Sequence, residues 1–282
     1  MQTIIQNASL KAVIKHKGAE LSSLEKDGEN YIWDIDTRFW DKTSPVLFPV
    51  IGALKNEEFE YDEKKYTLPR HGFAREKEFE IISKTEDSVV FSLKYDEETM
   101  EIYPFLFELQ IAYRIENSEL FVKYTVVNLD QKKLYYSIGA HPAFKIEGNF
   151  EEYSLQFDSN ETLVTHKLDN NLFNGKTVDV PLKNSFLLLS YQLFENDAIV
   201  LKNYTTTSLQ LLYYNQPKFK VKFSDFPYLG IWTKKDAPFI CIEPWRGIAD
   251  NTTASGKIEE KEGIEIVEIH SKKSFEWSIE VF

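Results

Sequence analysis

The clearest pattern along the chain is an alternation of apolar and polar residues with a period of two. Between residues 107 and 115 the apolar side chains fall on every second position, and residues 120–127 continue this pattern after a short Asn-Ser turn. This period is typical of β-strands with one buried face. Residues 79–82 and 89–93 are also strand-like, and the polar stretch between them predicts a hairpin. The middle of the chain therefore predicts an antiparallel sheet.

The last third of the chain predicts further strands. Composition and turn signals place them at residues 198–202, 208–214, 218–223, 229–233, 264–269 and 275–281. Helical turns are predicted at residues 36–40, 96–102 and 190–195. We find no interdomain linker and no internal repeat of fixed period. The sequence therefore predicts one all-β domain over residues 1–282.

One apolar segment does not fit the strand pattern. Residues 44–52, Ser-Pro-Val-Leu-Phe-Pro-Val-Ile-Gly, contain two prolines, which disfavour a central strand or a helix. The apolar content of this segment nevertheless predicts burial. We therefore expect an irregular buried segment that lines a site.

Composition and charge narrow the class of protein. The chain has 282 residues, of which 43% are hydrophobic and 28% are charged, as is typical of a globular protein with a large core. The formal net charge of −12 opposes binding to nucleic acid or to an anionic membrane. The first residues lack a signal-peptide pattern, no apolar stretch has the length of a membrane span, and the single cysteine excludes an intrachain disulfide. We expect a cytoplasmic protein.

A single carboxylate follows one of the most apolar runs of the chain. Residues 240–247, Ile-Cys-Ile-Glu-Pro-Trp-Arg-Gly, contain one acidic residue, Glu243, followed directly by proline. An apolar run that stops at Glu-Pro predicts a buried strand that ends at a pocket. Partial burial raises the pKa of a carboxyl group toward the range useful for a general base. The alternative is that Glu243 marks a strand end and points into water.

Two histidines lie in segments that contain glycine and proline. His71 belongs to Leu-Pro-Arg-His-Gly-Phe-Ala-Arg at residues 68–75, and His141 belongs to Ser-Ile-Gly-Ala-His-Pro-Ala-Phe at residues 137–144. Such neighbours fix the backbone and allow a ligand to approach closely. A structural role explains each histidine when it is considered alone. Both histidines together with Glu243 indicate a functional site.

Four motifs, taken in order, resemble those of the aldose 1-epimerase (galactose mutarotase) family, and in particular its branch associated with bacterial lactose operons. They are Pro-Val-Leu-Phe-Pro at residues 45–49, His-Gly-Phe-Ala-Arg at 71–75, Gly-Ala-His-Pro-Ala-Phe at 139–144 and Ile-Glu-Pro-Trp at 242–245. The resemblance covers nearly the whole chain. It implies a large antiparallel β supersandwich, the galactose-mutarotase-like fold, which agrees with the strand pattern.

The resemblance also implies roles for individual residues. Glu243 corresponds to the general base that removes the proton from the anomeric hydroxyl, and His141 corresponds to the general acid that protonates the ring oxygen. His71 corresponds to a second histidine that helps to hold the ring-oxygen side of the sugar, whereas Asp197 and Arg75 correspond to residues that contact the sugar. The implied activity is that of an isomerase, which opens and recloses an aldohexose and so interconverts its α and β anomers.

Proton transfer alone accounts for this chemistry. Ring opening takes a proton from O1 while another reaches O5, and one carboxylate with one imidazolium provides both near neutral pH. The sequence has no cluster with metal-ligand spacing and no glycine-rich phosphate loop. We therefore expect no metal and no cofactor, and we expect Cys241 to be a packed strand residue and not a nucleophile. The expected partner is an aldose sugar, and the expected assembly is a monomer or a homodimer.

One position departs from the family pattern. Many relatives carry a sugar-binding arginine shortly after the Pro-Val-Leu-Phe-Pro motif, where this chain has Ala53. Lys55 is the nearest basic replacement, although its flexible ammonium lacks the planar donors of a guanidinium. From Ala53 and the net charge, we expect a neutral aldose to be used at least as well as its 6-phosphate.

Two alternatives to a mutarotase for neutral aldoses stay open. A mutarotase for hexose 6-phosphates needs a cationic pocket, for which the nearby basic residues are Arg70, Arg75, Lys55 and Arg246. A carbohydrate-binding or regulatory protein with weak turnover is the other alternative, because a fold does not guarantee an activity.

Overall fold

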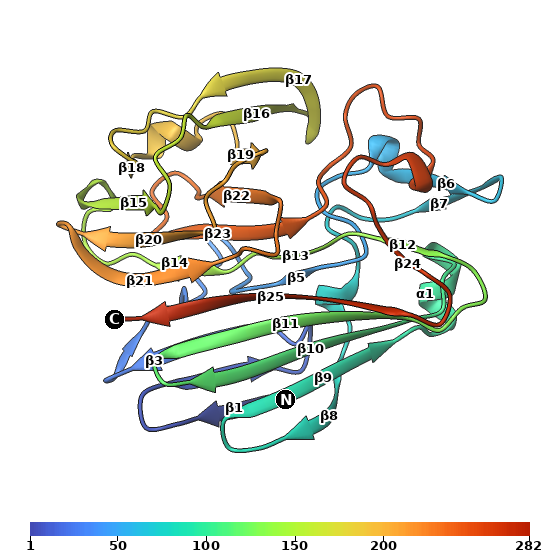
Figure 1. Cartoon of the computed structure of the whole chain (residues 1–282), viewed down its shortest axis with the longest axis horizontal. Helices are drawn as coiled ribbons and strands as arrows, with labels where there is room; N and C mark the ends of the chain where they lie inside the picture. The colour runs from blue at the N-terminus through green and yellow to red at the C-terminus, as the bar shows by residue number, and fades with distance from the viewer.

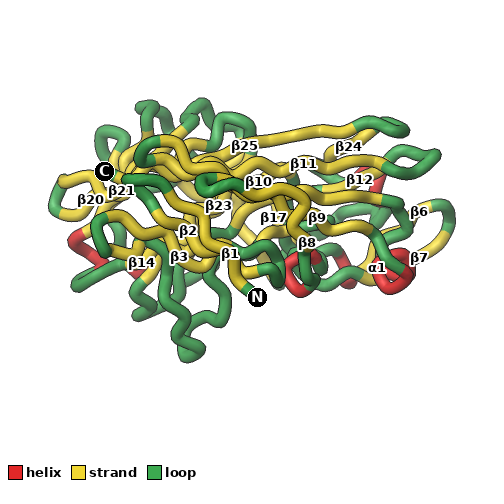
Figure 2. Tube along the Cα trace, turned by 90° about the horizontal axis from the view of Figure 1, so that it is seen from below, coloured by secondary structure: helices red, strands yellow, loops and turns green.

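The computed structural model describes residues 1–282, and antiparallel strands make up most of it (Figure 1). Helical structure is limited to short segments around the strands, as Figure 2 shows. They are the α-helix α1 (Glu97–Ile102) and five 3-10 turns at Lys55–Glu57, Ala74–Glu76, Phe150–Glu152, Tyr191–Phe194 and Ile258–Glu260. None of these helices has the length and hydropathy that a membrane-spanning segment needs.

The largest sheet has nine strands, and every neighbouring pair in it is antiparallel. In spatial order they are β18 (Phe186–Leu188), β15 (Tyr153–Phe157), β20 (Ser208–Tyr213), β21 (Gln216–Lys222), β25 (Lys272–Val281), β11 (Glu119–Asn128), β10 (Phe107–Glu116), β9 (Ser88–Lys94) and β8 (Glu80–Lys84). Strand β25 lies between β21 and β11, so it joins the two halves of this sheet (Figure 1).

A second sheet of eight strands carries the candidate site. Its strands are β17 (Leu172–Asp179), β16 (Val164–Asp169), β19 (Ile199–Lys202), β22 (Tyr228–Trp232), β23 (Phe239–Arg246), β13 (Ile138–Ala140) and β5 (Val46–Leu47), with β14 (Ala143–Lys145) also paired to β23. The three strands that pair with β23, namely β13, β14 and β22, are all antiparallel to it.

Three smaller sheets complete the architecture. One has four strands, β1 (Gln2–Gln6), β2 (Lys11–Lys15), β3 (Leu21–Lys26) and β4 (Glu29–Asn30). The other two have two strands each, β6 (Glu58–Tyr61) with β7 (Lys64–Thr67), and β12 (Leu134–Tyr136) with β24 (Glu265–Val267).

Burial along the strands follows the hydrophobic pattern of the sequence. In β10 the odd-numbered positions from Phe107 to Ile115 are buried, whereas the even-numbered ones are not. One hydrophobic cluster of 64 buried residues includes side chains from Ile5 to Val281. The expected all-β antiparallel architecture is confirmed, and so is the hairpin between β8 and β9.

The expected irregular segment at residues 44–52 is also present. These residues are buried except Gly52, which is half-buried, and only β5 within them is a strand. The segment contributes Ile51 and Gly52 to the wall of a cavity. The prediction that it lines a site is therefore consistent with its position.

The three expected helical turns are present. The segment at 96–102 is α1, whose first turn is capped by the Asp96 side chain, and the segment at 190–195 contains a 3-10 turn. At residues 36–40 the chain makes the one expected turn, a tight reversal in which the backbone N–H groups of Phe39 and Trp40 both donate to Asp36 O, at 2.9 and 3.0 Å. The Asp36 side chain accepts a hydrogen bond from the backbone N–H of Arg38, as the cap of this turn is expected to do.

Candidate functional site

A cavity of about 260 Å³ opens along the eight-stranded sheet. All five residues selected from the sequence line it: Glu243, His141, His71, Arg75 and Asp197. They come from segments far apart in the chain, so only the fold brings them together. The cavity is small for a ligand pocket, and its wall combines aromatic, charged and polar groups, which suits a small polar ligand.

Glu243 lies inside β23 and not at its end. The strand continues through Pro244 to residue 246, so the prediction that it ends at Glu-Pro is wrong. On one side β22 pairs with β23 without a break, and Gly230 lies opposite Glu243. The Glu243 residue is only 1% exposed, and the alternative of a carboxylate pointing into bulk water is therefore wrong as well.

The neighbouring strand explains why a proline is tolerated inside β23. On the side of β23 that faces β13 and β14, the backbone N–H of Ile242 donates to Pro142 O. The backbone nitrogen of Pro244, two positions further along the strand, faces the same side. At that point the partner strand is interrupted, because β13 ends at Ala140 and β14 begins at Ala143. The missing N–H of the proline thus faces a gap in the pairing, where it costs no ladder hydrogen bond.

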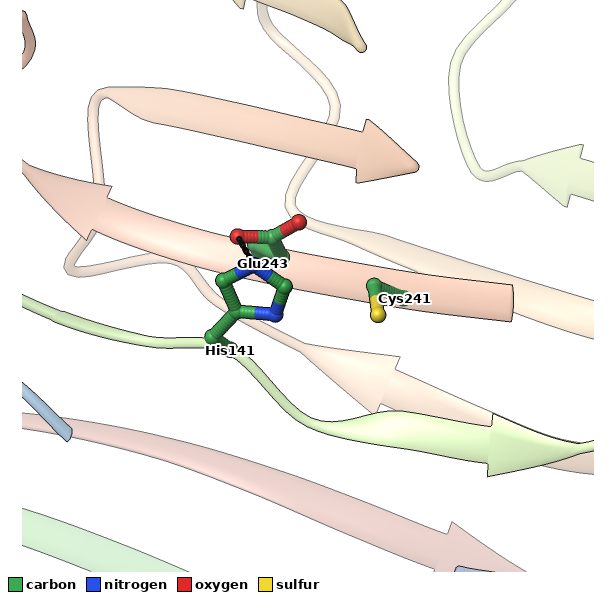
Figure 3. A group of neighbouring side chains, drawn as sticks. All are labelled: His141, Cys241 and Glu243. Carbon is green, nitrogen blue, oxygen red and sulfur yellow. Dashed lines mark ion pairs between the residues drawn. The ribbon is translucent and has the colours of Figure 1, made fainter. Parts of the chain in front are cut away.

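The same interruption positions His141. It lies between β13 and β14 and faces Glu243 on β23, as Figure 3 shows. His141 Nε2 is 3.2 Å from Glu243 Oε2, and the two side chains are 12% and 2% exposed. Neither His141 Nδ1 nor Glu243 Oε2 has a hydrogen-bond partner of good geometry. The His141 imidazole and the Glu243 carboxyl group are therefore in contact where little water reaches them, and both keep polar atoms that can bind a ligand.

Burial opposes a charge on either member of this pair. It lowers the pKa of His141 to about 3 and raises the pKa of Glu243 well above its usual range. The protein groups alone therefore favour a neutral imidazole beside a protonated carboxyl, with one proton on the pair. The imidazolium and carboxylate expected from the sequence thus need a ligand that stabilises their charges.

His71 is held as a neutral hydrogen-bond donor. The backbone N–H of Gly52 donates to His71 Nδ1 at 3.1 Å, so the ring proton is on Nε2. Burial also lowers the pKa of His71 well below its usual value. The next residue must be glycine, because a Cβ atom on Gly72 would lie 2.2 Å from Phe48 O. This close approach packs the His71 loop against the proline-rich segment.

Asp197 and the two arginines of the cavity place charges around the pair. Asp197 has a backbone φ of 96°, which is unfavourable for a residue with a side chain, and such strain is common at functional sites. Arg75 donates to Arg70 O at 2.9 Å, but its Nε is buried without a partner. Arg70 also lines the cavity.

Two tryptophans that the sequence motifs did not indicate, Trp40 and Trp232, also line the cavity. The Trp40 ring lies 4.8 Å from the ring of His141, and Trp232 lies 5.8 Å from it, centroid to centroid. Trp40 belongs to the tight reversal at residues 36–40. A tryptophan in such a polar turn is the sequence feature that could have indicated its role in the site. Their apolar faces suit the C–H face of a sugar ring.

His141, Cys241 and Glu243 are the one group that resembles a metal site (Figure 3). One ligand atom from each lies within 4.8 Å of the others, and nitrogen, sulfur and oxygen are donors that zinc accepts. A tetrahedral zinc brings its ligand atoms to about 3.5 Å from one another. Cys241 is fully buried in an apolar cluster and does not line the cavity, so the group does not fit a metal without rearrangement.

Ala53 and Lys55 do not contribute to the cavity wall. Lys55 Nζ instead donates to Ala254 O at 3.2 Å. Lys55 therefore does not replace the arginine that many relatives carry. Arg246 is also directed elsewhere, since its Nη2 forms an ion pair with Glu265 Oε1 at 2.7 Å. Of the basic residues considered from the sequence, only Arg70 and Arg75 lie at the cavity.

Comparisons with known proteins agree with this architecture. The family model for aldose 1-epimerase matches residues 1–263. The chromosomal protein LacX of Lactococcus lactis subsp. lactis is 34% identical over 293 residues, with 98% of each chain covered. A galactose mutarotase related enzyme from Lactobacillus acidophilus has a TM-score of 0.95 at 31% identity, covering 100% of this chain and 97% of its own. A galactose mutarotase-like protein from Lactobacillus casei also has a TM-score of 0.95, at 30% identity and full coverage of both chains.

These similarities extend over nearly the whole chain, and they confirm the galactose-mutarotase-like sandwich that the four motifs implied. The family acts on sugars as carbohydrate epimerases. The chain belongs to the aldose 1-epimerase family.

Proposed function

We propose that the protein is an aldose 1-epimerase that interconverts the α and β anomers of an aldohexose. The observation that carries this proposal is the contact of 3.2 Å between His141 and Glu243 at a cavity of about 260 Å³. In a pyranose, O1 and O5 are bonded to the same carbon. Groups that exchange protons with both oxygens must therefore lie side by side, as a carboxyl and an imidazole do here.

In the proposed reaction Glu243 takes the proton of O1–H while His141 Nε2–H gives a proton to O5. The C1–O5 bond breaks, the C1–O1 bond becomes the carbonyl of the open-chain aldehyde, and rotation about C1–C2 precedes closure on the other face. The reverse transfers return both protons, so the pair ends with the proton it began with. The sugar favours the ion pair that burial opposes, because O1–H donates to the carboxylate and O5 accepts from the imidazolium.

The other groups of the cavity hold the sugar in this orientation. The neutral His71 presents Nε2–H as a donor close to His141, with the two ring centroids 5.9 Å apart, so it can bond the ring-oxygen side. Trp40 and Trp232 border His141 and offer flat apolar surfaces to the ring C–H groups. Asp197 and Arg75 provide an acceptor and a donor for hydroxyl groups.

Measurement of anomer exchange tests the proposal directly. The purified protein is added to a freshly dissolved single anomer of glucose or galactose, and equilibration is followed by polarimetry and by NMR exchange spectroscopy. We expect equilibration much faster than in buffer alone. If the protein binds these sugars and their 6-phosphates in calorimetry but accelerates exchange of none of them, it is a binding protein and the proposal is wrong.

The proposed reaction moves only protons, so we expect full activity after exhaustive treatment with EDTA. Anomer exchange is compared before and after chelation, and again after Zn²⁺ or Mg²⁺ is added back. The same protein dialysed without EDTA serves as the control. A large loss on chelation that a metal restores would contradict the proton-transfer mechanism.

A hexose 6-phosphate is the second candidate substrate, and the two arginines of the cavity favour it. The chain has five arginines, and three of them, Arg38, Arg114 and Arg246, form ion pairs with carboxylates. Arg70 and Arg75 form none, and both line the cavity. In an aldohexopyranose C6 is bonded to C5, the carbon next to the ring oxygen O5. A 6-phosphate therefore lies on the side of the sugar that His141 faces in the proposed reaction. Guanidinium groups that form no ion pair with a carboxylate are suited to bind it.

The variant Arg75→Met separates the two substrates. If the arginines bind a phosphate, kcat/KM for the 6-phosphate is expected to fall by about tenfold to a hundredfold, and that for the neutral sugar by much less. Steady-state exchange rates for both sugars measure this. Arg114→Met, which removes the same charge from the distant strand β10, controls for the change in net charge. Equal losses for both substrates would show that Arg75 serves the sugar ring and not a phosphate.

A further inference from the structure

Trp245 occupies a slot made by two glycines of neighbouring strands. A Cβ atom on Gly230 of β22 would lie 2.6 Å from its Cζ2, and one on Gly139 of β13 would lie 2.7 Å from its Cδ1. Both distances are shorter than real Cβ contacts, so a side chain at either position would have to displace the indole. The indole is therefore held between the two strands that flank β23, with no room to rotate.

The slot determines where the indole nitrogen lies. Nε1 belongs to the ring edge that runs from Cδ1 to Cζ2, and so it lies between the two glycine contacts. Gly139 is the pairing partner of Trp245 itself, whereas Gly230 is the partner of Glu243. The nitrogen edge therefore extends along the sheet from Trp245 toward Glu243. Glu243 and Trp245 are two positions apart on the strand, so their side chains share a face, and both line the cavity.

Two buried polar atoms without hydrogen-bond partners of good geometry lie in this region. Trp245 Nε1 has no hydrogen-bond acceptor of good geometry, and Glu243 Oε2 has no donor of good geometry, although His141 Nε2 lies 3.2 Å from it. Buried polar groups are nearly always paired in folded proteins, so an unused donor beside an unused acceptor indicates a functional arrangement. Burial has the largest effect on the pKa of Glu243 and raises it, whereas the indole of Trp245 has a smaller effect and lowers it.

We propose that Trp245 is a positioning residue for Glu243: the two glycines hold the indole N–H at the carboxyl group, where it stabilises the ionised form that accepts the sugar proton. This inference rests on the proposed function, because it gives Glu243 the role of base. The indole is a neutral donor, so it favours the carboxylate without adding a charge or a second titration to the site.

Other groups around Glu243 also influence its ionisation. His141 is in contact with it on one side, Asp197 disfavours the carboxylate, and Arg70 favours it. On the same strand the buried Cys241 thiol has a raised pKa, first because of burial and then because of Glu243. All of these groups stay in place when Trp245 is changed to phenylalanine. A change in the titration of the site is then due to the lost N–H donor.

The main test is the pH profile of kcat/KM for Trp245→Phe. Phenylalanine keeps an aromatic ring in the slot but has no donor. The acidic limb of the profile, which reports the macroscopic pKa of the Glu243–His141 pair, is expected to move up by about 1–2 pH units. Well above that limb, kcat is expected to stay within a few fold of wild type. An unchanged limb in a folded variant, or a higher KM with no shift of the limb, would overturn the proposal.

A second variant changes the slot and keeps the donor. In Gly230→Ala the new Cβ displaces the indole, so the acidic limb is expected to move in the same direction as in Trp245→Phe. Trp277→Phe removes the N–H of a buried tryptophan on β25, outside the cavity, and is expected to keep the wild-type limb. Circular dichroism and melting curves confirm that each variant is folded. A shift in Trp277→Phe as large as in Trp245→Phe would overturn the proposal.

A readout without turnover distinguishes a failure of this inference from a failure of the proposed function. With glutamate labelled by ¹³C at the carboxyl carbon, the signal of Glu243 is assigned by its absence in Glu243→Gln. Its titration is expected at higher pH in Trp245→Phe than in wild type, even if the wild type exchanges no anomers. If anomer exchange is present but this titration is the same in both proteins, Trp245 does not position Glu243.

Discussion

The variant Glu243→Gln is expected to lower kcat for anomer exchange by about 10²–10⁴-fold, the usual contribution of a general base. Glutamine keeps the length and hydrogen-bonding reach of glutamate, but its amide cannot accept the proton of O1–H. Sugar affinity is expected to change far less, because the amide can still bond a hydroxyl. The measurement is NMR anomer exchange at saturating sugar, with binding measured separately by calorimetry.

Two comparisons decide whether this result concerns the base itself. Glu108→Gln makes the same chemical change on strand β10, outside the cavity, and is expected to leave kcat unchanged. Since Glu243 is buried and its pKa is raised, glutamine also removes little charge from the fold, and a large loss of stability is not expected. A Glu243→Gln variant that is folded and keeps full kcat would show that another group is the base.

The variant His141→Asn is expected to lower kcat by a similar factor, because asparagine cannot deliver a proton to O5. The double variant Glu243→Gln with His141→Asn is expected to lose less than the product of the two single losses. Acid and base serve one transition state, and once either is lost the other has little left to contribute. Single-turnover exchange of one anomer with all three variants measures this coupling.

His71 provides the matched control for the histidine. It lies in the same cavity, but Gly52 N–H fixes it as a neutral donor. His71→Asn is therefore expected to raise KM more than it lowers kcat. If instead it lowers kcat as strongly as His141→Asn does, then His71 and not His141 is the proton donor to the ring oxygen.

Much of the fold followed from the period of the sequence, and the failures have physical reasons. Strands β10 and β11 have one buried face, so their residues alternate and the pattern locates them. The hairpin of β16 and β17 was not predicted, because most of β17 is exposed and its sequence carries no apolar face. Side chains of this hairpin nevertheless form part of the cavity wall, among them Leu168 and Phe173.

The site was predicted to a similar extent. Short sequence motifs identified individual residues such as Glu243 and His141, and the fold brings these residues into one cavity. The break between β13 and β14, the contact of the pair and the lack of carboxylate partners around Arg75 are relations between distant segments. No local pattern encodes them, because each depends on which strands become neighbours.

The position of β25 has a consequence for how the chain folds during synthesis. In the nine-stranded sheet, the ribosome completes one group of strands (β8 to β11) and the other (β15, β18, β20 and β21) well before residues 272–281. Only these last residues, as β25, pair with both groups. Until they emerge, β11 and β21 each present an unpaired edge, and such edges are prone to pair with other chains. A nascent chain stalled before Lys272 therefore has two unpaired strand edges that can aggregate. We expect the chain to depend on chaperones at this stage of translation.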